Sequence, residues 1–191
     1  MRVFLRFKES ATSQVVYWVF SLVFLAAVAG VPALARNKHG QSRNEGRLVE
    51  EVRHQLVTLP WYGVFDNLEY QVRGDTVILS GQVTRPTLKS DAEARVKRLE
   101  EVSRVINNIE VLPLSPNDDR IRIATYRAIF SQPGLDRYAM MAVPPIHIIV
   151  KNGNLTLVGV VATEGDKNQA GIIARTVSGV FSVTNDLRVE K

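Results

Sequence analysis

The stretch YQVRGDTVILSGQV, residues 70–83, recurs without a gap as IIVKNGNLTLVGVV, residues 148–161, and this pair decides the fold. The same offset of 78 residues continues downstream, where Asn107 falls on Asn185 and Val111 on Val189. Self-similarity at a fixed period indicates that one supersecondary unit occurs twice in the chain. The sequence therefore predicts two related domains in tandem.

Each stretch predicts two strands joined by a tight hairpin. The turns are Gly74-Asp75 in the first copy and Asn152-Gly153 in the second, and Gly and Asn accept the positive φ that such turns require. Gly81 and Gly159 also coincide inside the second strand, where a glycine usually marks the close approach of another backbone.

Helical patterns surround each hairpin. After it, apolar residues at helical spacing predict a helix over about residues 87–101, with a counterpart over 166–178, and a closing strand follows each. Ahead of it, apolar stripes ending before Pro60 and Pro133 predict an opening helix. The predicted fold class is α+β, with two tandem αββαβ domains, each a three-stranded mixed sheet with two helices packed on one face.

The N-terminal segment has the pattern of a secretory signal. A basic start precedes an apolar run over residues 15–31 and the small-residue sequence Pro32-Ala33-Leu34-Ala35, which predicts a signal peptide over residues 1–35 cleaved after Ala35. The alternative is an uncleaved anchor in the inner membrane, because an apolar run of 17 residues approaches the minimum length for spanning. The remaining chain divides into a flexible spacer (36–46), a first domain (47–112), a linker (113–118) and a second domain (119–191).

The repeat resembles the BON domain, the bacterial OsmY and nodulation domain. The second copy has the residues of that pattern at Gly153, Leu155, Thr156, Leu157, Gly159, Val161, Ala170, Gly179, Val180, Val183, Asn185, Leu187 and Val189. The first copy has Asp75, Val77, Leu79, Ser80, Gly81, Val83, Ala92, Val102, Val105, Asn107, Ile109 and Val111, with Glu101 in place of the glycine before the closing strand. The resemblance implies an envelope-associated periplasmic protein without enzyme activity, in a family linked to phospholipid binding, envelope integrity and osmotic-stress protection.

The residues predict no catalytic site, no metal site and no cofactor. The chain has no cysteine, and its three histidines, His39, His54 and His147, lack the spacing of metal ligands. Asp118-Asp119 precedes an apolar stripe and predicts a helix N-cap with a favourable dipole contact. The formal net charge of +5 is spread along the chain, which disfavours nucleic-acid binding.

Two surfaces of the second copy are candidates for binding. One is a basic opening helix that would lie on anionic lipid, with the candidate residues Arg120, Arg122, Tyr126, Arg127 and Phe130, although core packing explains its apolar members equally well. The other is the outer strand face, where Ile149, Val158 and Val160 replace the polar residues of the first copy. An apolar face of this kind predicts a partner, a second subunit or packing against the other copy.

The sequence thus favours a non-enzymatic, exported envelope protein whose partners are an anionic phospholipid surface or other envelope proteins. The competing hypothesis is a periplasmic chaperone or stress-protection protein that holds unfolded clients on exposed apolar strand surface. A lipid binder depends on the arginines and on salt, whereas a client holder depends on Val158 and Val160.

Overall fold

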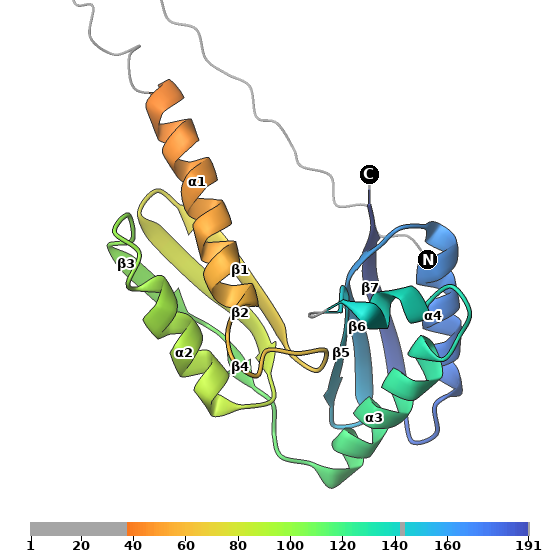
Figure 1. The fold of residues 1–191 in the computed structure, drawn as a ribbon. Coiled ribbons are helices and arrows are strands. Elements are labelled where there is room, and N and C mark those ends of the chain that lie inside the picture. The colour runs from red at the N-terminus through yellow and green to blue at the C-terminus, as the bar shows by residue number, and fades with distance from the viewer. Residues whose placement is uncertain (1–37, 142–143, 191) are drawn as a thin grey trace, which may run out of the picture. The chain divides into compact units, whose positions relative to one another are not determined.

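The first repeat folds as helix, hairpin, helix and closing strand, as its sequence predicts. The computed structural model describes residues 38–141 and 144–190, with side chains from Gly46 onward. The elements are α1 (Lys38–Val57), β1 (Asn67–Arg73), β2 (Thr76–Val83), α2 (Pro86–Val96), β3 (Arg104–Asn107) and β4 (Glu110–Val111). β2 lies at the centre of the sheet, antiparallel to β1 and parallel to both β3 and β4 (Figure 1).

The second repeat has the same order of elements and a continuous closing strand. It comprises α3 (Pro116–Phe130), the 3₁₀ helix η1 (Asp136–Met140), β5 (Ile146–Lys151), β6 (Asn154–Val161), α4 (Glu164–Thr176) and β7 (Ser182–Val189). β6 is antiparallel to β5 and parallel to β7. The prediction of two αββαβ domains is therefore confirmed, and residues 37–191 form one compact unit that contains both.

Each repeat has its own hydrophobic core between its two helices and one face of its sheet. In the first repeat the side chains of Val77, Leu79 and Val83 on β2 are fully buried, and they pack with residues of α1 and α2. In the second, Leu155, Leu157 and Val161 do the same with α3 and α4. Burial of each such side chain contributes about 1.5–3 kcal/mol, so the period-two pattern fixes which face meets the helices.

The repeated strand glycines lie where no side chain fits. Gly81 has a φ of 105°, and a Cβ there would lie 2.1 Å from the carbonyl oxygen of Asn67. Gly159 has a φ of 126°, and its Cβ would lie 1.9 Å from the carbonyl oxygen of Pro145. The predicted close approach of another backbone is confirmed at both positions.

Buried carboxylates hold loops in both repeats. Asp118 of α3, 1% exposed, accepts the N–H groups of Asn152 and Gly153 in the second hairpin turn at 2.9 and 2.8 Å. In the first repeat, Asp66 accepts the backbone N–H and the hydroxyl of Thr84.

The predicted N-cap at Asp118-Asp119 is wrong, because Ser115 caps α3 by accepting the N–H of Asp118. Both aspartates still lie in the first turn, where the helix dipole favours negative charge.

The shared asparagine fastens the closing strand to the second helix. Asn107 donates its side-chain N–H to the carbonyl of Lys89 at 2.9 Å, and its side-chain oxygen accepts the backbone N–H of Ile109. Asn185 makes the equivalent bonds to Lys167 and Leu187. The motif residue therefore has a packing role in both copies.

Three boundaries differ from the sequence prediction. α1 begins at Lys38, within the expected flexible spacer 36–46, because no proline interrupts the chain before the apolar stripe. α3 begins at Pro116, within the expected linker 113–118, because proline suits the first turn of a helix. α2 ends at Val96 rather than near Glu101, and Glu101 pairs with Arg47 of α1. Gly179 takes a φ of 89° before β7, whereas Glu101 at the matching position does not adopt a positive φ.

The predicted signal peptide (1–35), its cleavage after Ala35 and the alternative anchor at 15–31 lie outside the described residues. Among the helices that the structure describes, none is both long and apolar enough to cross a membrane.

Candidate functional site

The outward face of α3 carries two arginines around an isoleucine. Arg120 and Arg127 are exposed, and Ile123, 46% exposed, lies between them at helical spacing. Neither arginine forms an ion pair with a carboxylate of the described residues, and Arg120 instead donates to the side-chain oxygen of Asn117. This face therefore presents two cations and one large apolar side chain to solvent.

Arg122, expected on the same face, is buried instead. Only 4% of it is exposed, because its guanidinium reaches across to β5 and donates to the carbonyl oxygen of Val150 at 2.6 Å. It also pairs with Asp119 on the same helix. Its Nε and the hydroxyl of Thr125 are the buried side-chain atoms left without a partner in the described part of the chain. Arg122 thus fastens α3 to the sheet and is not available to lipid.

The two aromatic candidates also face inward. Phe130, 8% exposed, belongs to the core of the second repeat, and Tyr126 is half-buried beside it with ring centroids 4.8 Å apart. Tyr126 also meets the ring of Phe65 edge-on. The expectation that Tyr126 and Phe130 contact lipid is not supported, since a helix that covers a sheet must first bury its apolar stripe.

The second helix of the same layer carries two further exposed residues. α4 packs against α3 (Figure 1). Ile172, 61% exposed, and Arg175 are exposed on α4. Sequence reasoning missed both residues. Helical spacing would have found Ile172, because it lies on the side of α4 opposite the buried Ala170 and Ala174.

The outer face of β5 and β6 is less open than its sequence predicts. Ile149 is 5% exposed, Val158 is half-buried, and Val160, at 37%, is the one of the three candidates that solvent reaches freely. The predicted apolar surface is therefore reduced largely to Val160.

The segment over residues 62–66 of the first repeat lies against β5 of the second. The carbonyl oxygen of Val64 accepts the N–H of Ile148 at 2.8 Å, and the rings of Tyr62 and His147 stack with centroids 5.6 Å apart. Burial raises the pKa of Tyr62 to about 12. The segment covers one edge of the second sheet, which would otherwise offer unpaired backbone groups.

The family of the chain follows from a direct comparison. The sequence profile of the BON domain matches residues 44–113 and again residues 117–191, which is most of the chain and both repeats. The chain belongs to the BON domain family. The resemblance seen in the repeated motifs is thereby confirmed.

The solved structures that match this chain include the C-terminal domain of CdsD, a structural protein of the Type III secretion system of Chlamydia trachomatis. One such structure is 12% identical, with 75% of this chain and 98% of that chain covered and a TM-score of 0.27. A second CdsD structure is 13% identical, with coverage of 76% and 94% and a TM-score of 0.29. No curated protein matches the sequence.

The histidines of the two BON domains have different surroundings. His54 is exposed on α1, whereas His147 is buried on β5 with its Nδ1 atom 3.3 Å from the carbonyl oxygen of Gly63. Burial lowers the pKa of His147, against smaller opposing effects of Gly63 and Asp66. No group of three or more side chains suited to a metal ion occurs within the described residues.

Proposed function

We propose that this tandem BON protein is an envelope-associated binding module whose second domain contacts anionic phospholipid through the outward face of α3 and α4. The observation that carries the proposal is the placement of Arg120, Ile123 and Arg127 on one exposed face. Arginines attract the phosphate groups of anionic lipid, and an exposed apolar side chain between them can enter the headgroup layer.

The first domain lacks this combination, which supports the choice of the second. By the offset of 74 residues that aligns the opening helices, Gly46 and Val49 occupy the places of Arg120 and Ile123. Arg53 occupies that of Arg127, but it pairs with Glu50 on the same helix. A surface with neutralised charge gains little from an anionic membrane.

The client-holding alternative receives less support. It depends on the outer face of β5 and β6, where Ile149 is buried and Val158 is half-buried. A small exposed apolar area is ordinary for a folded surface.

Co-sedimentation with vesicles tests the proposal. We use residues 36–191, because both hydrophobic cores lie within that segment, and compare anionic with neutral vesicles at low and high salt. We expect binding to anionic vesicles that weakens with salt and is lost in the double variant Arg120→Ala, Arg127→Ala.

A charge-matched control separates the proposed face from net charge. Arg73→Ala with Arg104→Ala removes two exposed arginines from the first domain and should leave binding nearly unchanged. Equal loss in both double variants, or no pelleting by the wild-type protein, would reject direct recognition of lipid by α3.

A further inference from the structure

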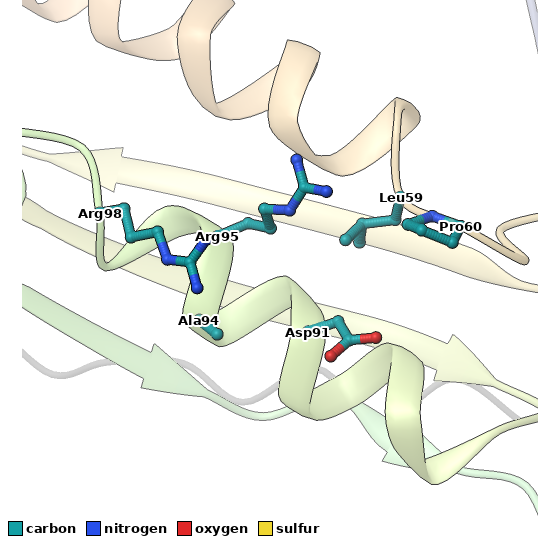
Figure 2. Close-up of a pocket in the computed structure, with 6 residues that line it drawn as sticks. All are labelled: Leu59, Pro60, Asp91, Ala94, Arg95 and Arg98. Carbon is teal, nitrogen blue, oxygen red and sulfur yellow. The ribbon is translucent and has the colours of Figure 1, made fainter.

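A hollow on the first domain, remote in sequence from α3, has the composition of a protein-binding site. It has a volume of about 190 Å³ and lies between the end of α1 and the outward side of α2 (Figure 2). Its apolar wall is made by Leu59 and Pro60, and its charged wall by Arg95 and Arg98, with Asp91 at the edge. The hollow therefore combines an apolar surface with a net positive charge.

The arginines of this hollow are free to bind an anion. Arg95 donates one hydrogen bond, to the side-chain oxygen of Gln55 at 3.4 Å, and neither Arg95 nor Arg98 forms an ion pair with a carboxylate of the described residues. Figure 2 shows the side chain of Arg95 leaving α2 toward the end of α1, and that of Arg98 leaving the turn that follows α2. Each guanidinium group can form charge-assisted hydrogen bonds with a carboxylate of a bound peptide.

Trp61, which follows the apolar wall directly, is held in an unusual conformation. Its φ is 69°, a region that is unfavourable for a residue with a side chain, and yet 72% of the residue is exposed. The guanidinium of Arg85 lies 4.9 Å from the centre of its ring. Because so exposed a ring adds little to the core, packing within the chain does not account for the strained backbone.

We infer that Trp61, Arg85, Arg95 and Arg98 form a docking site for an acidic protein segment that also carries apolar side chains. Tryptophan and arginine are the residues that most often dominate the binding energy of protein interfaces. The ring of Trp61 and the wall of Leu59 and Pro60 receive the apolar side chains, and the guanidinium groups receive the carboxylates. A hollow suits an inserted side chain better than the flat surface of a bilayer.

The site differs in position and ligand from the proposed lipid surface on α3 and does not depend on it. Its residues come from α2, from the turns on either side of α2 and from the turn that follows α1, all within the first domain. Loss of one activity should leave the other intact.

Peptide binding to the full chain in neutral detergent tests the inference. The probe is a fluorescein-labelled ten-residue peptide of Glu and Leu, compared with a peptide in which Gln replaces every Glu. We expect the acidic peptide alone to bind, and to bind at least about tenfold more weakly to Arg95→Ala with Arg98→Ala, as for removal of interface hot spots.

Two further variants keep the test independent of folding. Trp61→Asn should weaken binding while retaining the fold, because asparagine tolerates a positive φ. Arg73→Ala with Arg104→Ala removes the same charge elsewhere on the domain and should bind like wild type. No binding of the acidic peptide, equal weakening in the control pair, or binding to anionic vesicles in place of the peptide at this site would overturn the inference.

Discussion

Gly81 and Gly159 occupy the most constrained backbone positions of the two central strands. Each combines a positive φ with a neighbouring carbonyl oxygen at a distance that excludes a Cβ atom. Glycine weakens the interior of a strand, so a glycine at the same place in both copies indicates that another backbone lies close to it. These two glycines could therefore be used to align the repeats from sequence. Their agreement in both copies shows that this part of the motif specifies the path of the backbone.

We predict that Gly159→Ala lowers the free energy of unfolding of the second domain by about 2–4 kcal/mol, since the new Cβ would lie 1.9 Å from the carbonyl oxygen of Pro145. Urea denaturation measures this loss. Gly63→Ala is the control, because a Cβ there meets nothing within 4 Å. Equal stability of the two variants would contradict the assignment.

The burial of His147 predicts that the free energy of unfolding depends on pH. Because its pKa in the folded protein is lowered by burial, the folded state favours the neutral ring, and the unfolded chain takes up the proton first as the pH falls below about 6.5. The stabilisation is complete above that pH and declines below it, by at most about 1.4 kcal/mol per pH unit.

We therefore expect the wild-type protein to lose more stability between pH 7 and pH 5 than His147→Gln, as measured by urea denaturation at each pH. His54→Gln serves as the control, because it removes a histidine that is exposed on α1. A profile for His147→Gln identical to that of the wild type would show that His147 does not titrate differently in the folded state.

Among the elements, the contact of α3 with the second hairpin depends on one buried carboxylate. We predict that Asp118→Ala lowers the free energy of unfolding by about 2–3 kcal/mol, because the N–H groups of Asn152 and Gly153 lose a charged acceptor. Thermal unfolding followed by circular dichroism measures the effect. Asp186→Ala on β7, where the side chain is exposed, should change the Tm little, and similar shifts in both variants would contradict the role.

The elements themselves were predictable from sequence because their signals are local. Period-two and helical patterns, hairpin turn residues and the repeat gave the order αββαβ in both copies. The break between β3 and β4 was not predictable, since the apolar pattern of residues 104–112 continues across it. The closing strand of the first repeat is interrupted after Asn107, whereas β7 of the second repeat continues past the equivalent Asn185.

The face of α3 was only partly predictable, for a different physical reason. Charge and spacing indicate a basic amphipathic helix, but they do not distinguish an arginine in water from one that folds back onto the sheet. Arg122 folds back onto the sheet because the carbonyl oxygen of Val150, 28 positions further along the chain, is a buried acceptor for its guanidinium group. A contact between residues so far apart in the sequence cannot be predicted from the spacing of charged and apolar residues within the helix.

At the scale of the whole molecule, the two repeats share a fold and differ in the surfaces that they expose. The first offers the hollow beside Trp61, and the second offers the arginine-bearing face of α3. The segment over residues 62–66 joins them by pairing with β5. A duplicated packing unit thus exposes two different surfaces in one chain, and we propose a separate ligand for each.

The most direct test of the proposed lipid-contacting face of α3 labels that face at one position. Because the chain has no cysteine, Ile123→Cys carries a single environment-sensitive dye, and Ser90→Cys on the exposed side of α2 is the matched control. With residues 36–191 and anionic vesicles, we predict a blue shift of the dye at position 123 that high salt reverses, and none at position 90. The same response at both positions, or no response at position 123, would contradict the account.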